Sequence, residues 1–178
     1  MQPSIRLITL DLDDTLWPCM PVIRGAEQAL YDWMAAQTPR ITERHDLAAI
    51  QAHRGQIRER HPQLAHDVTA LRREALADLM RAQGYPESLA DEGMRVFRRQ
   101  RNQVEPYEDV RPVLLALRQD FTLIAITNGN AEVDETPLRG CFHHTLTAGE
   151  VGAEKPHPAL FEQAMAWAGA NPGQTLHL

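Results

Sequence analysis

Apolar residues follow two different periods along the chain, and the change between them divides it into regions. Residues 5–12, "IRLITLDL", form a short run rich in Ile and Leu, which is typical of a strand buried in a parallel sheet. From about residue 24 to residue 103 the apolar positions recur at helical spacing instead. The stretch "GAEQALYDWMAA", for example, places Ala26, Leu30 and Met34 on one helical face. We therefore expect a buried strand followed by a helical block.

Two further helices are predicted within this block. The stretch "HDVTALRREALADLMRAQG" has an apolar helical face, and Gly84 is suited to end that helix. Another helix is expected near residues 88–101, with Met94 and Phe97 on its apolar face. We interpret the arginines of the block as a solvated face rather than as substrate ligands; they include Arg72, Arg73, Arg98 and Arg101.

After Pro106 helices and strands alternate. A helix is predicted for "DVRPVLLALRQ", a second buried strand for "FTLIAIT", a short third strand for "HTLTAG", a helix for "HPALFEQAMAWAG", and a fourth strand for "TLHL". This alternation indicates an α/β fold with a Rossmann-like, doubly wound parallel sheet, into which an α-helical cap is inserted after the first strand. The expected core comprises residues 1–16 and 105–178, and the cap comprises residues 17–104.

Composition argues against several classes of function. A net charge of −6 and a pI near 5.7 give no overall attraction to nucleic acid or to anionic membranes. No apolar run reaches membrane-spanning length, and the N-terminus lacks the pattern of a secretory signal. Cys19 and Cys141 are far apart, which suits free thiols in a reducing compartment. We therefore expect a cytoplasmic protein, while the sequence leaves its oligomeric state open.

Three carboxylates are crowded directly after the first predicted strand, in "LITLDLDDTLW". Neighbouring carboxylates repel one another, and burial disfavours their charged form, so Asp11, Asp13 and Asp14 are costly unless a cation or a reaction uses them. Spacing of two along an extended segment places Asp11 and Asp13 on the same side. We expect these two residues to be functional and Asp14 to be structural.

Other polar residues follow the later strands. Thr127, Asn128 and Gly129 end the second strand, and Lys155, the single lysine beside 17 arginines, follows the third. Because ligands of open α/β sheets bind beyond the carboxyl ends of the strands, these groups are predicted to share one crevice with the carboxylates. A carboxylate can attack phosphorus, a second can move the proton of the leaving group, and a hydroxyl and an ammonium can bind phosphoryl oxygens. Such oxygen donors suit Mg²⁺ better than zinc.

The motifs "DLDDTLW", "ITNGN" and "EKPHPALF", in this order, resemble the first three motifs of the haloacid dehalogenase-like hydrolase superfamily, in its branch with a helical cap. The resemblance implies Asp11 as nucleophile, Asp13 as general acid and base, and Thr127 with Asn128 and Gly129 as phosphate ligands. It further implies Lys155 as the charge-balancing lysine, which also contacts substrate. A Mg²⁺ ion would be held by Asp11 and Asp13, the latter through its main-chain carbonyl.

A narrower resemblance concerns the substrate. The stretches "DLDDTLW", "HDVTALR" and "AITNGNA" are similar to bacterial phosphatases that act on flavin mononucleotide and on the phosphorylated pyrimidine precursor of riboflavin. We therefore expect a magnesium-dependent phosphatase that hydrolyses a small phosphorylated metabolite through an aspartyl-phosphate intermediate.

Two alternatives remain. The family carries a fourth, acidic motif after a later strand, whereas this sequence stops at "QTLHL", so we interpret the core as truncated there. A truncated, weakly active or inactive binding module is therefore one alternative. Dehalogenation of a 2-haloacid is the other, and Asp13 argues against it, because the dehalogenases of the superfamily lack this second acid.

Overall fold

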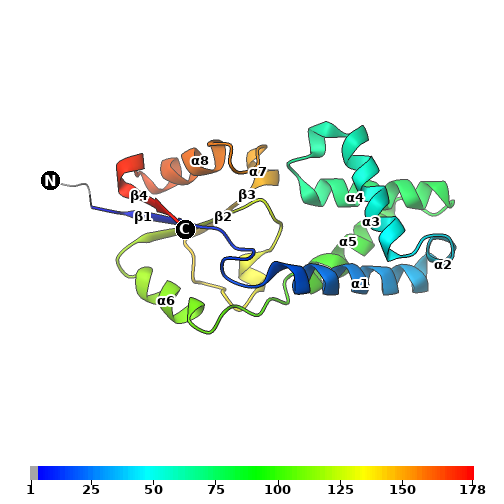
Figure 1. The fold of residues 1–178 in the computed structure, drawn as a ribbon, viewed down its shortest axis with the longest axis horizontal. Coiled ribbons are helices and arrows are strands. Elements are labelled where there is room, and N and C mark those ends of the chain that lie inside the picture. Colours follow the sequence, from blue (N-terminus) through cyan, green and yellow to red (C-terminus); the bar gives the residue numbers. More distant parts are fainter. Residues whose placement is uncertain (1–3) are drawn as a thin grey trace. The chain divides into compact units, whose positions relative to one another are not determined.

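The computed structural model describes residues 4–178 and divides them into two compact units. One unit comprises Val104–Leu178 with the described part of Met1–Cys19, and the other is Met20–Gln103. The first unit contains the sheet and the second is helical (Figure 1).

Four parallel strands form one sheet in the first unit, in the order β3-β2-β1-β4. β1 (Leu7–Leu10) pairs with β2 (Thr122–Thr127) and with β4 (Thr175–His177), while β3 (His144–Thr147) pairs with β2. All four residues of β1 are buried, because this strand has neighbours on both sides. The apolar runs of the sequence therefore predict the strands and their parallel arrangement correctly.

The register brings polar residues level with one another at the carboxyl ends of the strands. Leu10 is opposite Ala125 in the pairing of β1 with β2, and Thr127 is opposite Thr147 in the pairing of β2 with β3. Asp11, which follows Leu10, is consequently level with the carboxyl end of β2. This register places the motif after β1 beside the motif after β2.

Helices cover both faces of this sheet. α8 (Ala159–Ala168) and the short α7 (Ala148–Val151) lie on one side in Figure 1, and α6 (Val110–Leu117) lies on the other. Two 3₁₀ turns, Val133–Glu135 and Pro172–Gln174, complete the unit. The core between α8 and the sheet consists of Leu7, Ile124, Ile126, Leu146, Ala148, Leu160 and Ala164. Helices on both faces of a parallel sheet confirm the predicted doubly wound α/β fold.

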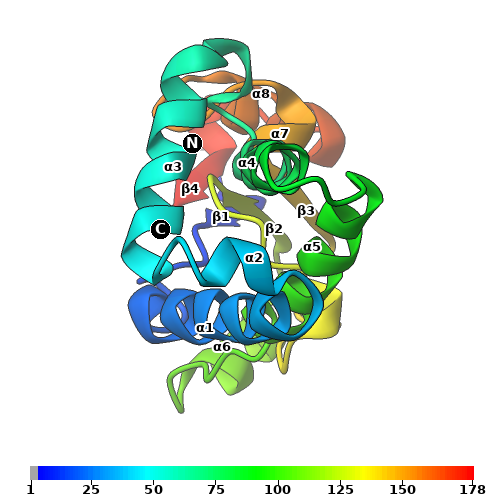
Figure 2. The same cartoon turned by 90° about the vertical axis from the view of Figure 1, so that its right-hand side faces the viewer.

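The second unit consists of helices that pack against one another (Figure 2). Its core consists mainly of Ala26, Leu30, Met34, Ile41, Leu76, Ala77, Leu79, Met80, Ala90, Met94 and Phe97. The helices are α1 (Cys19–Gln37), α2 (Pro39–Thr42), α3 (Leu47–Arg60), α4 (Val68–Ala82) and α5 (Ser88–Arg101), with a 3₁₀ turn at Pro62–Leu64. The expectation of a helical block is therefore confirmed.

The ends of α4 follow from local sequence. Asp67 precedes the helix, and its carboxylate accepts hydrogen bonds from the N–H groups of Thr69 and Ala70, which the helix cannot otherwise satisfy. After the helix, Gly84 adopts a φ of 68°, a left-handed conformation that glycine takes without steric cost. Gly84 therefore ends this segment as the sequence predicts.

The interpretation of the block's arginines as a solvated face is wrong for two of them. Arg72 is 7% exposed and Arg101 is 1% exposed. The guanidinium of Arg72 lies 3.7 Å from the centre of the Phe97 ring and 3.4 Å from the carboxylate of the buried Glu27. Burial, and next the charge of Arg54, lower the pKa of Arg72 to about 9. A buried carboxylate and an aromatic ring can thus stabilise a buried arginine. Hydrophobic periodicity alone does not predict such partners.

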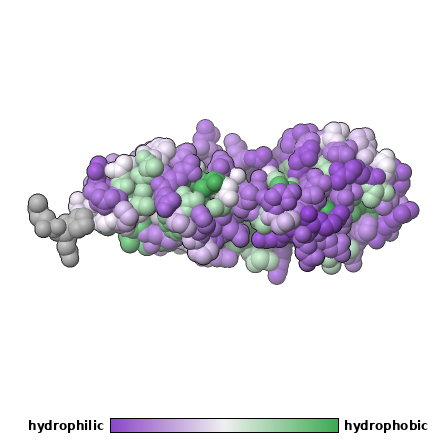
Figure 3. Space-filling view, turned by 90° about the horizontal axis from the view of Figure 1, so that it is seen from above, coloured by the Kyte–Doolittle hydropathy of each residue, from purple (hydrophilic) through white to green (hydrophobic). Residues whose placement is uncertain are grey.

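On the face drawn in Figure 3 the surface is mostly hydrophilic, and its hydrophobic residues lie in small areas. Within residues 4–178, no helix is both long and apolar enough to cross a membrane. Both cysteines are free thiols, as the sequence predicts, and Cys141 is buried.

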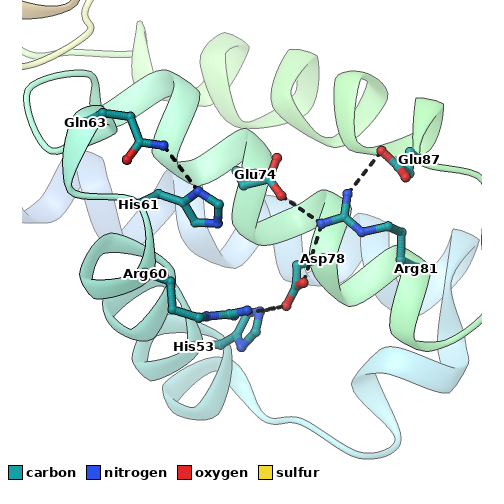
Figure 4. Close-up of polar contacts among 8 residues, drawn as sticks. All are labelled: His53, Arg60, His61, Gln63, Glu74, Asp78, Arg81 and Glu87. Carbon is teal, nitrogen blue, oxygen red and sulfur yellow. Dashed lines mark hydrogen bonds and ion pairs between the residues drawn. The ribbon is translucent and has the colours of Figure 1, made fainter.

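A network of ion pairs joins α3 to α4 on the surface of the helical unit (Figure 4). Asp78 contacts His53 at 3.0 Å, Arg60 at 3.3 Å and Arg81 at 3.4 Å. Partial burial favours a higher pKa of Asp78, but the hydrogen bond and charge of Arg60, with the charge of His53, outweigh it. The pKa of Asp78 therefore lies below its usual value.

We predict that Asp78→Asn destabilises the protein by about 1 kcal/mol at neutral pH, because an exposed network contributes modestly. A lowered folded-state pKa gives stability that is present above the unfolded pKa of 3.8 and is lost as the pH falls through the folded value. The difference between wild type and variant, measured by urea unfolding, should accordingly shrink below about pH 4. Glu59→Gln is the control, since Glu59 is exposed on α3 and has no ion pair within residues 4–178. A difference that stays constant down to about pH 2, where carboxylates are protonated, would contradict this account.

Candidate active site

The three acidic residues lie in a tight turn that directly follows β1. The N–H of Leu16 donates to the carbonyl of Leu12 over 2.8 Å, and the N–H of Asp14 donates to the carbonyl of Trp17 over 2.8 Å. The apolar residues of this turn are buried: Leu12, Leu16 and Trp17. Their burial fixes the turn to the core and leaves the acidic residues at the carboxyl end of the strand.

Two of the three carboxylates have partners within this segment. The indole Nε1 of Trp17 donates to Oδ1 of Asp13 over 2.9 Å. The backbone N–H of Cys19, the first residue of α1, donates to Oδ1 of Asp14 over 2.8 Å, which satisfies one of the helix's otherwise unpaired N–H groups. Asp14 also has a φ of 59°, a conformation that Asp tolerates better than most residues. These contacts give Asp14 a structural role, as expected.

Asp11, the third acid, pairs with the single lysine. Nζ of Lys155 lies 2.8 Å from Oδ1 of Asp11 and donates to the carbonyl of Ile126 over 2.8 Å. The ammonium of Lys155 can contact both the carboxylate oxygen of Asp11 and the carbonyl oxygen of Ile126, because the register places Asp11 level with the end of β2. The side chain of Lys155 is only 14% exposed, so the attraction is screened less than in an ion pair on the open surface.

The side chain of Asn128 holds the main chain of the same lysine. Its Nδ2 donates to the carbonyl of Lys155 over 3.1 Å, and its Oδ1 accepts from the N–H of Lys155 over 2.7 Å. Both ends of the amide are therefore used on one residue, although the two residues are 27 positions apart in the sequence. This double contact fixes the point from which the ammonium of Lys155 extends to Asp11.

Thr127 is buried, and its hydroxyl shapes the turn after β2. Oγ1 of Thr127 accepts a hydrogen bond from the N–H of Gly129 over 2.9 Å. The oxygen accepts in this contact, and the hydroxyl hydrogen has no acceptor among residues 4–178. This hydrogen is therefore available to an oxygen of a bound ligand.

The structure thus joins Asp11, Lys155 and Asn128 by direct contacts, while Asp13 contacts Trp17 and Thr127 contacts Gly129. Within residues 4–178, no three or more His, Cys, Asp or Glu side chains are grouped as a metal site. The donors that the sequence offers are carboxylate and carbonyl oxygens, from Asp11 and Asp13. Mg²⁺ prefers such donors, so the residues present fit this ion in kind.

The sequence did not predict three contacts of the site: the hydrogen bond from the indole of Trp17 to Asp13, the one from Lys155 to the carbonyl of Ile126, and those between Asn128 and the main chain of Lys155. Trp17 stands four positions after Asp13 in a turn, which is a usable signal for a side-chain contact. The other two depend on pairing between β1 and β2 and on the path of the loop before α8, and neither is visible in a local pattern.

Comparison with known proteins identifies the family. The sequence pattern of the haloacid dehalogenase-like hydrolases matches residues 5–178, so the chain belongs to this family and is a hydrolase, which confirms the resemblance seen in its motifs. The chain is 30% identical over 180 residues to 5-amino-6-(5-phospho-D-ribitylamino)uracil phosphatase YigB of Escherichia coli (strain K12), with 98% of this chain and 74% of that protein covered. It is also 30% identical over 207 residues to phosphoserine phosphatase of Thermus thermophilus, with 94% of this chain and 78% of that protein covered.

Solved structures give the same fold. The crystal structure of a 2-haloacid dehalogenase from Pseudomonas syringae pv. Tomato DC3000 superposes with a TM-score of 0.91 at 38% identity, covering 98% of this chain and 77% of that one. The L-2-haloacid dehalogenase PA0810 superposes with a TM-score of 0.60 at 20% identity, covering 98% of this chain and 75% of that one. The latter likeness supports the fold alone.

We predict that Asp14→Ala lowers the free energy of unfolding by about 2 kcal/mol, because it removes the contact with Cys19 and places a residue with a β-carbon but no polar side chain in the left-handed region. Asp14→Asn is the matched control, since it keeps an acceptor oxygen and tolerates this φ. Urea unfolding measures both. Equal losses in the two variants would show that neither the contact nor the conformation of Asp14 supports the turn.

Proposed function

We propose that this hydrolase is a magnesium-dependent phosphatase that cleaves a small phosphate monoester. The observation that carries the proposal is the Asp11 carboxylate held 2.8 Å from Nζ of Lys155, with Asp13 two residues further along the same segment. YigB and the Thermus phosphoserine phosphatase, which are phosphatases of small phosphorylated compounds by name, support this proposal.

Asp11 acts as the nucleophile in this proposal. Its carboxylate oxygen attacks phosphorus, the bond from phosphorus to the leaving oxygen breaks, and Asp13 gives that oxygen its proton. Water then attacks phosphorus of the aspartyl-phosphate, and Asp13 takes a proton from this water. Inorganic phosphate leaves with the Asp11 carboxylate restored and Asp13 protonated again. The hydrogen bond from Trp17 holds Asp13 in place for both proton transfers.

The remaining residues bind the phosphoryl group. The hydroxyl of Thr127, whose oxygen accepts a hydrogen bond from the N–H of Gly129, donates to an oxygen of this group. The ammonium of Lys155 offsets the negative charge of the phosphoryl oxygens and of Asp11. Asn128, which the sequence suggests as a further substrate ligand, serves through its hold on Lys155. Asp11 and Asp13 would hold Mg²⁺, which when bound neutralises negative charge on the phosphoryl group.

Substrate choice is assigned to the helical insertion. We propose residues 17–104 as a cap and residues 1–16 with 105–178 as the catalytic core, and we expect the cap to select a small phosphorylated metabolite of the nucleotide or flavin type. A cytoplasmic location suits such a substrate and the two free thiols.

Dehalogenation is the second candidate, and the likeness at 38% identity to a 2-haloacid dehalogenase structure favours it. The same nucleophilic carboxylate would then attack carbon instead of phosphorus. Halide, however, leaves without a proton, so the first step of that reaction has no use for an acid at Asp13. A phosphate monoester needs a proton on its leaving oxygen, and for this reason we prefer the phosphatase.

The proposal predicts that the chain releases phosphate from para-nitrophenyl phosphate only when Mg²⁺ is present, and that Asp11→Asn lowers kcat by at least about a thousandfold. Asp14→Asn is the matched control, since it alters a neighbouring carboxylate that contacts α1 rather than substrate. Chloride release from 2-chloropropionate without phosphate release would support the dehalogenase instead. A folded chain that shows neither activity would indicate a binding module.

We further predict that Asn128→Ala lowers kcat by about ten- to a hundredfold with a smaller change in KM, because the lost hydrogen bonds position the ammonium of Lys155 in the transition state. Asn128→Asp keeps an acceptor for the N–H of Lys155 but loses the donor to its carbonyl, and it should fall between wild type and Asn128→Ala. Steady-state kinetics measures both variants. A rise in KM alone would instead assign Asn128 to direct substrate binding.

A further inference from the structure

A polar cavity lies at the opposite end of the sheet from Asp11, where the strands begin. Its volume is about 320 Å³, at the lower end of the range for ligand sites. Most of the residues that line it precede or open β1, β2 and β3; these include Arg6, Arg118, Gln119, Asp120, Thr122 and His143. β2 spans roughly 16 Å between this cavity and the candidate active site, so a ligand here would not touch Asp11.

Two positively charged side chains of this cavity, Arg6 and Arg118, have no ion-pair partner among residues 4–178. Within the same residues, their guanidinium groups form no hydrogen bond either. Nε of Arg118 is buried and has no hydrogen-bond partner. A buried N–H group without an acceptor is unfavourable and is uncommon unless water or a ligand supplies one. Asp120 is an acid of the lining but pairs with neither arginine, so two cations face one carboxylate.

His143, which also lines the cavity, supplies a third N–H donor. Its Nδ1 accepts a hydrogen bond from the N–H of Leu123 over 3.0 Å, so the neutral ring carries its hydrogen on Nε2. Burial, and next the positive charge of Arg118, lower the pKa of His143. The ring is therefore neutral at physiological pH and provides an N–H donor.

We propose that this cavity binds a phosphate group, either as inorganic phosphate or as part of a phosphorylated metabolite. Two planar guanidinium groups and one imidazole N–H, which come from three separate segments, offer more donors than one carboxylate can accept. A phosphate has the additional oxygens to accept them. The volume leaves room for a small organic part beside the phosphate. Such a site would let a phosphorylated compound act on the protein away from the candidate active site, and it does not depend on the proposed phosphatase activity.

The test is a titration of the full chain with inorganic phosphate, in which binding is monitored by the side-chain NMR signals of His143. These signals are assigned by their absence in His143→Gln, since the chain holds eight histidines. We expect phosphate to shift them to saturation, while chloride at the same ionic strength does not. Arg118→Gln should weaken binding at least about tenfold, and Arg6→Gln should weaken it as well. The matched control Arg139→Gln, at an exposed arginine outside the lining, should leave it unchanged.

A second titration distinguishes the source of the phosphate group. A phosphonate analogue of a sugar phosphate, whose carbon–phosphorus bond resists hydrolysis, should bind more tightly than inorganic phosphate if the natural ligand is a metabolite. If it binds no more tightly, the ligand is free phosphate. Equal shifts with phosphate and chloride, or wild-type affinity in Arg118→Gln, would overturn the proposal. Should Arg118→Gln fail to fold, Arg6→Gln decides by the same criterion, because its side chain is exposed.

Discussion

The ion pair between Lys155 and Asp11 is the interaction on which the candidate site depends, because it joins segments that are distant in the sequence. Asp11 follows β1, the carbonyl of Ile126 belongs to β2, and Lys155 arrives from the loop before α8. A lysine with 14% of its side chain exposed could not be placed there without acceptors for its ammonium. Asp11 and Ile126 supply them, and Asn128 fixes the main chain behind the lysine. The position of the ammonium therefore depends on the register of the sheet, on the path of the loop before α8 and on the charge of Asp11.

The crowding of three acids after β1 is resolved by giving each a different partner. Asp11 faces an ammonium, Asp13 accepts from an indole, and Asp14 accepts from a backbone N–H at the start of α1. The buried side chains of the turn make this separation possible, because they point into the core while the acids point out of it. In the proposed mechanism the first carboxylate attacks phosphorus and the second transfers the proton, while the contact of the third with α1 supports the fold.

Much of the fold could be predicted from the sequence, since it depends on patterns that are local. The apolar runs predict β1 and β2, helical spacing predicts α1, α4 and α5, and Gly84 predicts the end of α4. Contacts set by tertiary structure could not be predicted. Arg72 is buried in contact with Glu27 and Phe97, which stand 45 and 25 positions away in the chain. The periodicity of the sequence does not predict contacts over such separations. The contact of Asn128 with Lys155 could not be predicted for the same reason: the motif gives the position of Asn128, while the contact requires the folded loop.

The relatives of this chain include named phosphatases and a named dehalogenase, and both chemistries can begin at the same carboxylate. The most direct test of our account is therefore to find the atom that becomes attached to Asp11. The chain is mixed with a phosphate monoester and Mg²⁺, quenched in acid within one turnover, digested, and analysed by mass spectrometry with fragmentation of the peptide that holds Asp11. We predict the added mass of one phosphoryl group on Asp11. Continued phosphate release with the phosphoryl group on another residue, or on none, would contradict the account.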